Sequence, residues 1–239
     1  MIFKYCPQCG EKLILKEIGD EGEVPYCGSC RRPFFSFSYP CVICLVTDGA
    51  GQFALIKQGY VSDRWVCVAG YVQRGETLEE AAAREVEEET GLKVKEVKYL
   101  KSYYFGRDDN LMAGFAVIAE HGDFTLSGEV DSAEWFDEKT AEELLSGGKV
   151  CNELMGEYLK EKELELQKKH PCIGDVRGIG LMTGMELVFN RDTHDSIHPL
   201  ADGSDPIHEL EKYLISKGLL AGIKAPSLLV MAPPLSVLL

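Results

Sequence analysis

Three glutamates at residues 85, 88 and 89 have the spacing that a divalent-metal site on a helix requires. Because Glu85, Glu88 and Glu89 stand at i, i+3 and i+4, a helix places their carboxylates on one face of one turn. Three like charges so close repel one another, and a hard cation such as Mg²⁺, which prefers oxygen ligands, removes the conflict. Glu87 lies on another face and is expected to be solvated. The pattern predicts that the other three glutamates bind a divalent ion.

The alternative meaning of an acidic run is an exposed helix face without a ligand. Here the run keeps a fixed spacing to Gly70, Glu76, Gly91 and Leu92, and chance rarely fixes so many positions together. The neighbouring Arg84 can hold a carboxylate in one orientation through two parallel hydrogen bonds. This combination favours the metal site over the solvated face.

A helix over residues 77–90 must carry these glutamates. Thr77 and Glu80 have the capping-box spacing at its start, and Gly91 provides the stop. Val86 and Leu92 can anchor the helix in a core. Short apolar runs bounded by turn residues predict strands on both sides of it, and two more helical patterns follow. The expected strands cover 41–47, 52–57, 65–69, 94–100, 111–120 and 133–136, and the further helices cover 138–145 and 150–168.

Residues 70–92 resemble the Nudix box, GX5EX7REUXEEXGU with U an apolar residue, and every fixed position matches. The resemblance covers about residues 37–160. It implies an α/β fold, an α/β/α sandwich with a mixed sheet. It also implies a Nudix-type pyrophosphohydrolase that uses Mg²⁺ or Mn²⁺ to hydrolyse a nucleoside diphosphate linked to another moiety.

The same resemblance implies that Glu85, Glu88 and Glu89 hold the catalytic ion, with Arg84 beside them. Such a site often recruits one further carboxylate from outside the box. Glu129 is the candidate, because it precedes an expected strand that should return beside the helix. The alternative for Glu129 is an ordinary glutamate of a surface loop.

Two CxxC pairs near the start of the chain, Cys6 with Cys9 and Cys27 with Cys30, are separated by seventeen residues. This spacing is typical of a zinc ribbon, in which four thiolates surround Zn²⁺ and leave no open position, so the role is structural. A segment as short as residues 1–36 cannot build an adequate core alone, and the metal supplies its folding energy. The alternatives are a redox pair or chance. A third pair, Cys41 and Cys44, is interpreted as buried thiols of a strand.

A zinc ribbon directly before a Nudix domain resembles the NADH pyrophosphatases and their shorter relatives. That group carries SQPWPFPxS after the box, whereas residues 102–110 here read SYYFGRDDN. Tyr103, Tyr104 and Phe105 can stack on a base of the substrate, or they are ordinary strand residues. NADH, ADP-ribose, FAD and nucleotide sugars all stay open as substrates.

The composition narrows the class of protein. The chain has 239 residues, of which 45% are hydrophobic, and a net charge of −14 that repels the backbone of duplex nucleic acid. No apolar run is long enough to cross a membrane and no secretory signal opens the chain, so we expect a soluble cytoplasmic protein. Nine cysteines then indicate metal binding and buried thiols rather than disulfides.

The third part, residues 161–239, follows a densely charged segment (160–170) that has the composition of a helix end or a linker. The run HPxIGDVRGIGLMxGMELV (170–188) and the later APPL (232–235) resemble the α+β C-terminal small domain of class III pyridoxal-phosphate aminotransferases. The domain that carries that family's lysine is absent, so no transamination is expected. The segment is interpreted as a fusion remnant or as a packing or oligomerisation element, and a homodimer stays open.

Two function classes compete with the hydrolase. One is a catalytically quiet nucleotide-binding protein on the same fold, and the other is a zinc-ribbon module that docks a partner protein. Metal-dependent turnover separates the hydrolase from both.

Overall fold

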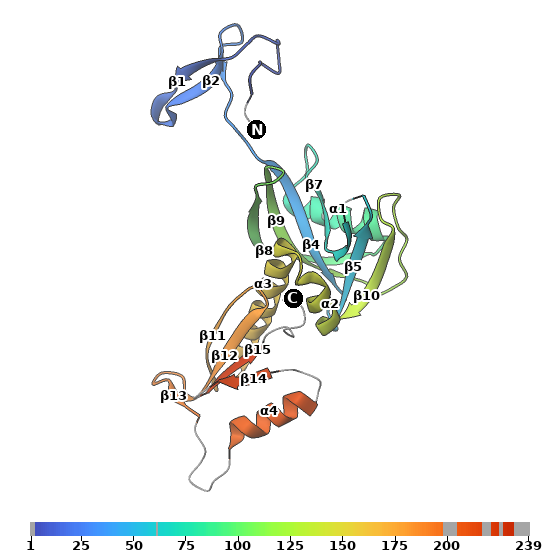
Figure 1. The fold of residues 1–239 in the computed structure, drawn as a ribbon, viewed down its shortest axis with the longest axis vertical. Coiled ribbons are helices and arrows are strands. Elements are labelled where there is room, and N and C mark those ends of the chain that lie inside the picture. Colours follow the sequence, from blue (N-terminus) through green and yellow to red (C-terminus); the bar gives the residue numbers. More distant parts are fainter. Residues whose placement is uncertain (1–2, 61, 198–204, 217–220, 225–226, 232–239) are drawn as a thin grey trace.

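The computed structural model describes residues 3–60, 62–197, 205–216, 221–224 and 227–231. Figure 1 shows three parts in chain order, with a small β ribbon at one end, an α/β body in the middle and a second sheet at the other end. No helix among the described residues combines the length and the apolar character that crossing a membrane requires.

The middle part contains a mixed sheet of seven strands. The strand order is β10-β5-β4-β9-β8, with β6 paired to β5 and β7 paired to β4. β4 runs parallel to β9 and antiparallel to β5 and β7. The strands are β4 (Tyr39–Thr47), β5 (Gln52–Gln58), β6 (Ser62–Val66), β7 (Val68–Tyr71), β8 (Val94–Phe105), β9 (Asn110–Ala119) and β10 (Ser132–Asp137).

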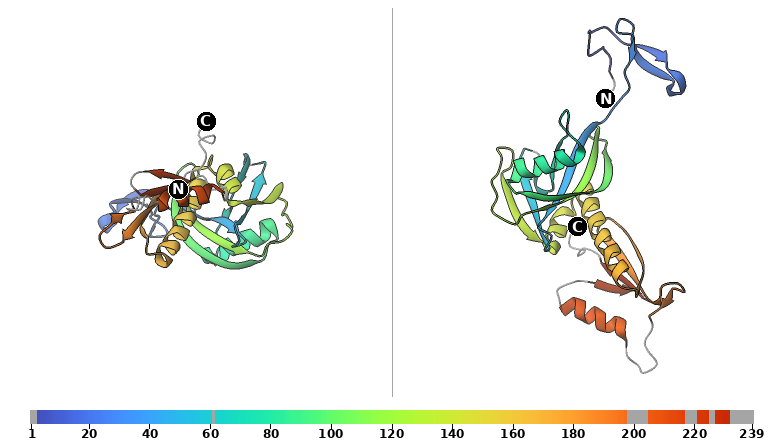
Figure 2. Two further views of the ribbon diagram at one scale, coloured as in Figure 1. Left: turned by 90° about the horizontal axis from the view of Figure 1, so that it is seen from below. Right: turned by 180° about the vertical axis from the view of Figure 1, so that it is seen from behind.

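Helices cover both faces of this sheet, which confirms the expected α/β/α sandwich. Successive residues of β4 point to opposite faces. Val42, Cys44 and Val46 join the cluster under α1 (Leu78–Thr90). Ile43 and Leu45 join the cluster under α2 and α3. The bounds of the latter two helices are Glu138–Leu145 and Lys149–Lys169, and Figure 2 shows them from two further sides.

One strand prediction was wrong. The expected strand over 65–69 is two strands, because the chain changes partner at Cys67: β6 ends at Val66 beside β5, and β7 begins at Val68 beside β4. The apolar pattern runs unbroken through this point, so it carries no sign of the change.

The N-terminal part is a three-stranded antiparallel sheet, with β2 paired to both β1 and β3. Ring contacts connect it to the sandwich, from Phe3 to Phe37 and from Phe37 to Tyr39 at the start of β4. Its elements are β1 (Ile14–Glu17), the 3-10 turn η1 (Gly19–Glu21), β2 (Glu23–Cys27) and β3 (Arg32–Pro33).

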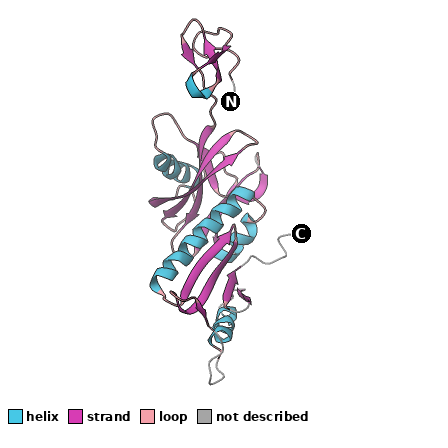
Figure 3. Ribbon diagram, turned by 90° about the vertical axis from the view of Figure 1, so that its left-hand side faces the viewer, coloured by secondary structure: helices cyan, strands magenta, loops and turns pink. Residues whose placement is uncertain are grey.

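The C-terminal part is a sheet of order β11-β12-β15-β14 with α4 (Pro206–Ser216). α3 continues to Lys169, so the expected boundary between residues 160 and 161 falls inside a helix that contacts both sheets (Figure 3). Here Thr183 donates to buried Glu163 at 2.6 Å. The aminotransferase resemblance stays a prediction, and residues 232–235 lie outside the described residues. The strands are β11 (Ile173–Ile179), β12 (Met182–Asn190), β13 (Asp195–Ser196), β14 (Ala221–Lys224) and β15 (Leu228–Met231).

Candidate active site

Local sequence fixes both ends of α1. The capping box is present, since the Thr77 hydroxyl accepts from the Glu80 amide and the Glu80 carboxylate accepts from the Thr77 amide. Gly91 ends the helix with a φ of 71°, a left-handed conformation that glycine adopts without strain. Val86 is fully buried against the sheet. The caps and this packing therefore fix the position of the helix, and with it the positions of its glutamates relative to the sheet.

Strand topology decides which edge of the sheet these glutamates meet. Because β4 is antiparallel to β5 and β7, the start of β4 lies beside the ends of both strands. Tyr39 at that start pairs with Asn110, the first residue of the parallel strand β9. The start of β10 also lies there, with Ser132 opposite Lys57. The end of β5, β7 and the loop before β10 contact the C-terminal half of α1.

The Glu85 carboxylate lies against the backbone of Gly70 in β7. A Cβ atom at residue 70 would overlap the Glu85 carboxylate group, so only glycine leaves room for it. The Glu85 side chain is 13% exposed. Burial raises the pKa of this carboxyl group, and the Arg84 guanidinium opposes the rise.

Arg84 connects the two segments of the motif. Its Nε and Nη2 donate to the two carboxylate oxygens of Glu76 at 2.5 and 3.0 Å. Its Nη1 donates to Glu85 at 2.9 Å and to Glu88 at 3.0 Å, and Nη2 also reaches the Tyr71 carbonyl at 3.1 Å. The fork of donors thus orients the carboxylates around it.

Glu89 is the most buried acid of the site, with 5% of its surface exposed. Its Oε1 accepts from Gln58 Nε2 at 3.0 Å, and its Oε2 is buried with no protein partner. Burial first, and then the charge of Glu85, raises the pKa of Glu89 to about 7. A buried carboxylate oxygen without a donor is costly, so this atom needs a partner, which a cation, a proton or a water molecule can supply.

Glu129 lies in the loop before β10, near enough for its charge to contribute to the raised pKa of Glu89. Asp131 fastens this loop to the end of β5: its carboxylate accepts from the Gly59 amide at 2.5 Å, and its amide donates to the Lys57 carbonyl at 2.9 Å. The part of the loop that contains Glu129 therefore lies near Glu89 of α1.

The predicted ligands do not all converge to the same degree. Glu89 is buried and Glu85 is partly buried, whereas Glu88 is 58% exposed and turned onto Arg84. Within the described ranges, the cysteine cluster is the only group of three or more candidate ligands whose donor atoms all lie within 4.8 Å of one another. Among the glutamates of α1, Glu89 Oε2 is the buried oxygen that is open to a cation.

The three aromatic residues after the box point in different directions. Tyr103 is 8% exposed and belongs to the core cluster beneath α3, on the sheet face opposite α1. Tyr104 is exposed, and its hydroxyl donates to Asp109 at 3.0 Å. Phe105 is half-buried at the end of β8. Stacking on a base stays a prediction for this segment, with Tyr104 the most accessible ring.

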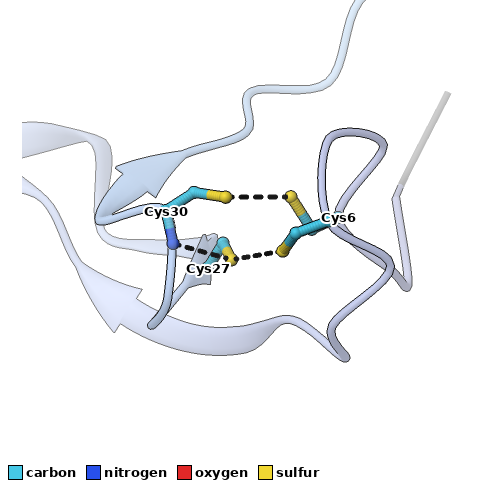
Figure 4. A group of neighbouring side chains, drawn as sticks. Cys6, Cys27 and Cys30 are labelled. Carbon is cyan, nitrogen blue, oxygen red and sulfur yellow. Dashed lines mark hydrogen bonds between the residues drawn. The ribbon is translucent and has the colours of Figure 1, made fainter.

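The four N-terminal cysteines converge. Their Sγ atoms all lie within 4.8 Å of one another, with 3.9 Å between Cys6 and Cys30 and 3.5 Å between Cys9 and Cys27. Tetrahedral Zn²⁺ with Zn–S bonds of about 2.3 Å places sulfurs about 3.8 Å apart. Figure 4 shows sulfurs from the two CxxC segments facing each other. The cluster fits one tetrahedral metal.

Sequence reasoning missed one residue that touches a predicted ligand, and it gave no partner for a second residue, Glu76. Gln58 ends an ordinary strand pattern, so no local feature reveals that its amide reaches Glu89. Glu76 was visible as a fixed position of the motif, but its pairing with Arg84 depends on the loop between β7 and α1. Both contacts join residues from different elements.

Comparison with known proteins agrees with this geometry. The family model described as NUDIX domain matches residues 38–150. The NAD-capped RNA hydrolase NudC of Vibrio atlanticus is 28% identical over 155 residues, covering 64% of this chain and 56% of the relative. Nudix hydrolase 19, chloroplastic, of Arabidopsis thaliana is 30% identical over 197 residues, covering 78% and 42%. The chain thus spans about half the length of these curated relatives.

Among solved structures, a NUDIX hydrolase from Nitrosomonas europaea superimposes with a TM-score of 0.50 and 26% identity, over 57% of this chain and 79% of that one. The region that matches the family model, residues 38–150, contains the α1 glutamates, Gly70, Arg84 and Gln58. Residues 38–150 therefore form a Nudix domain.

Proposed function

We propose that this chain is a Mg²⁺- or Mn²⁺-dependent hydrolase of the phosphoanhydride bond in a nucleoside diphosphate linked to a second group. The observation that carries the proposal is the buried Glu89 carboxylate, whose Oε2 has no protein partner while its Oε1 is held by Gln58. A divalent ion satisfies that oxygen and offsets the repulsion from Glu85.

Glu85 and Glu89 would hold the ion, and Glu88, which pairs with Arg84 in this structure, would complete the set. When bound, the ion neutralises pyrophosphate charge and lowers the pKa of a water molecule. Glu129 is the exposed carboxylate at the rim, and its role is to accept a proton from the attacking water or to complete the ligand set. Arg84 keeps the carboxylates oriented through the contacts to Glu76 and Glu85.

The second half of the substrate is proposed from surface chemistry and from the names of the relatives. Tyr71 and Tyr104 are exposed aromatic rings, 57% and 66% respectively, at the same edge of the sheet as Gly70. Rings in such positions stack on bases. The candidate substrates are NADH, ADP-ribose, FAD and nucleotide sugars. NAD-capped RNA is a further candidate, because relatives are named NAD-capped RNA hydrolases. Each contains the nucleoside diphosphate linkage.

For the ribbon, we infer that Cys6, Cys9, Cys27 and Cys30 bind one structural Zn²⁺. Four thiolates leave no position for a substrate. With β strands of two to five residues, this part holds few buried side chains, and the metal supplies the missing stability.

A substrate panel tests the proposed function. The purified chain is incubated with each candidate in Mg²⁺, in Mn²⁺ and in EDTA, and mass spectrometry identifies the phosphorylated products. We expect metal-dependent release of a nucleoside monophosphate from at least one substrate. Binding without turnover would instead favour the quiet nucleotide-binding protein, and the absence of both would favour the interaction module.

A further inference from the structure

Gln58 is a polar residue of the sheet whose side chain reaches the carboxylate of Glu89. It is 8% exposed and ends β5, where the pairing with β6 is irregular between Ile56 and Gln58. Its Nε2 donates to Glu89 Oε1 at 3.0 Å. The other oxygen of the same carboxylate, Oε2, has no partner. The two oxygens of Glu89 therefore have different environments.

We propose that Gln58 is a positioning residue that holds Glu89 Oε1 and thereby presents Oε2 to the divalent ion. An ionised carboxylate only accepts hydrogen bonds, so the group that orients it must donate. The side-chain amide donates without adding charge, whereas a lysine or arginine there would compete with the ion. The inference rests on the proposed function, because it takes Glu89 as a metal ligand.

The end of β5 is rigid enough for this role. The next residue, Gly59, donates its amide to the Asp131 carboxylate, and Asp131 returns a hydrogen bond to the Lys57 carbonyl. Gln58 therefore sits between two backbone anchor points. Partners of this kind, which orient a ligand without touching the metal, typically change metal affinity or activity by about 10- to 100-fold when they are removed.

The probe is Mn²⁺ alone, without any substrate. The electron paramagnetic resonance signal of free Mn²⁺ measures how much of the ion the full chain leaves unbound. Gln58→Met keeps the length and removes the donor, and Gln58→Leu removes the donor with a shorter apolar side chain. Gln52→Met, at the opposite end of β5, is the matched control. Glu89→Gln reports whether Glu89 is a ligand. Circular dichroism checks that each variant is folded.

We expect Gln58→Met and Gln58→Leu to weaken Mn²⁺ binding by about 10- to 100-fold, with Gln52→Met within about twofold of the parent. If Glu89→Gln weakens binding but both Gln58 variants bind like the parent, the positioning role is wrong and the proposed function stands. A lower melting temperature of the Gln58 variants with unchanged Mn²⁺ affinity would also overturn the positioning role. If the parent binds no Mn²⁺, or binds it as Glu89→Gln does, the metal assignment itself fails.

Discussion

The carboxylate of Glu85 occupies the space where a side chain at residue 70 would begin. Two segments fifteen residues apart in the sequence thus meet at van der Waals distance, and the site exists only while residue 70 lacks a Cβ atom. The fixed glycine of the motif is explained by this contact rather than by a turn, because its φ lies outside the left-handed region.

Gly70→Ala tests this contact. The overlapping atoms belong to the end of a flexible side chain, so Glu85 can move aside with little loss of stability. A ligand displaced by about 1 Å can lower turnover by about 100-fold. We expect metal-dependent hydrolysis to fall by that order, while thermal unfolding stays near that of the parent. Gly122→Ala is the control, since nothing lies within 4 Å of a Cβ there. Unchanged turnover in Gly70→Ala contradicts the account.

Arg84→Lys tests the guanidinium fork. A lysine cannot donate to both oxygens of Glu76 and to Glu85 at once, so the carboxylates lose their common orientation. We expect hydrolysis to fall by about 10- to 100-fold and the half-saturating Mg²⁺ concentration to rise. The control is Arg107→Lys, whose side chain is 85% exposed. Equal metal dependence in Arg84→Lys and the parent would show that the fork is dispensable.

The features that could be predicted from the sequence are those that local spacing determines. The capping box, Gly91 and the period of the glutamates fix α1, and short apolar runs mark β4, β5 and β9 within one or two residues. The long-range contacts could not be predicted. Glu163 belongs to a charged run that suggests a helix end or a linker, yet in α3 it is buried and accepts a hydrogen bond from Thr183 of β12. Gln58 likewise gains its role only when β5 and α1 pack together.

Cys27→Ser tests the cysteine cluster. We expect about one Zn²⁺ per parent chain by mass spectrometry under native conditions, because four thiolates complete one tetrahedral site. The variant should lose the metal, and proteolysis should then cut within residues 1–36, since the metal supplies the folding energy of this part. Cys172→Ser, at an exposed position, should retain Zn²⁺. Full zinc content in Cys27→Ser is the result that counts against the assignment.

Glu142 provides a test of pH-dependent stability away from the site. Burial, with the charges of Glu138 and Glu143, raises the pKa of Glu142 to about 7. The folded chain therefore holds this proton more tightly than the unfolded chain, whose glutamate pKa is about 4.3. Stability from this group is full below that value and is lost as the pH rises toward 7. We expect Glu142→Gln to unfold at a higher temperature than the parent at pH 8 and at a similar temperature at pH 4.

A matched variant isolates this effect. Glu134→Gln removes a charge from an exposed position of β10, and it should change the melting temperature by a similar small amount at both pH values. If the difference between Glu142→Gln and the parent does not depend on pH, burial does not control this carboxyl group.

The central claim is that Glu89, held by Gln58 on one oxygen and free on the other, binds the divalent ion that drives hydrolysis. The most direct measurement is the Mg²⁺-dependent turnover of Glu89→Gln on whichever panel substrate the parent cleaves, with the melting temperatures of both proteins recorded. We predict that turnover falls by about 100-fold or more while the fold is retained. Near-normal Mg²⁺-dependent hydrolysis by the folded variant would contradict the account.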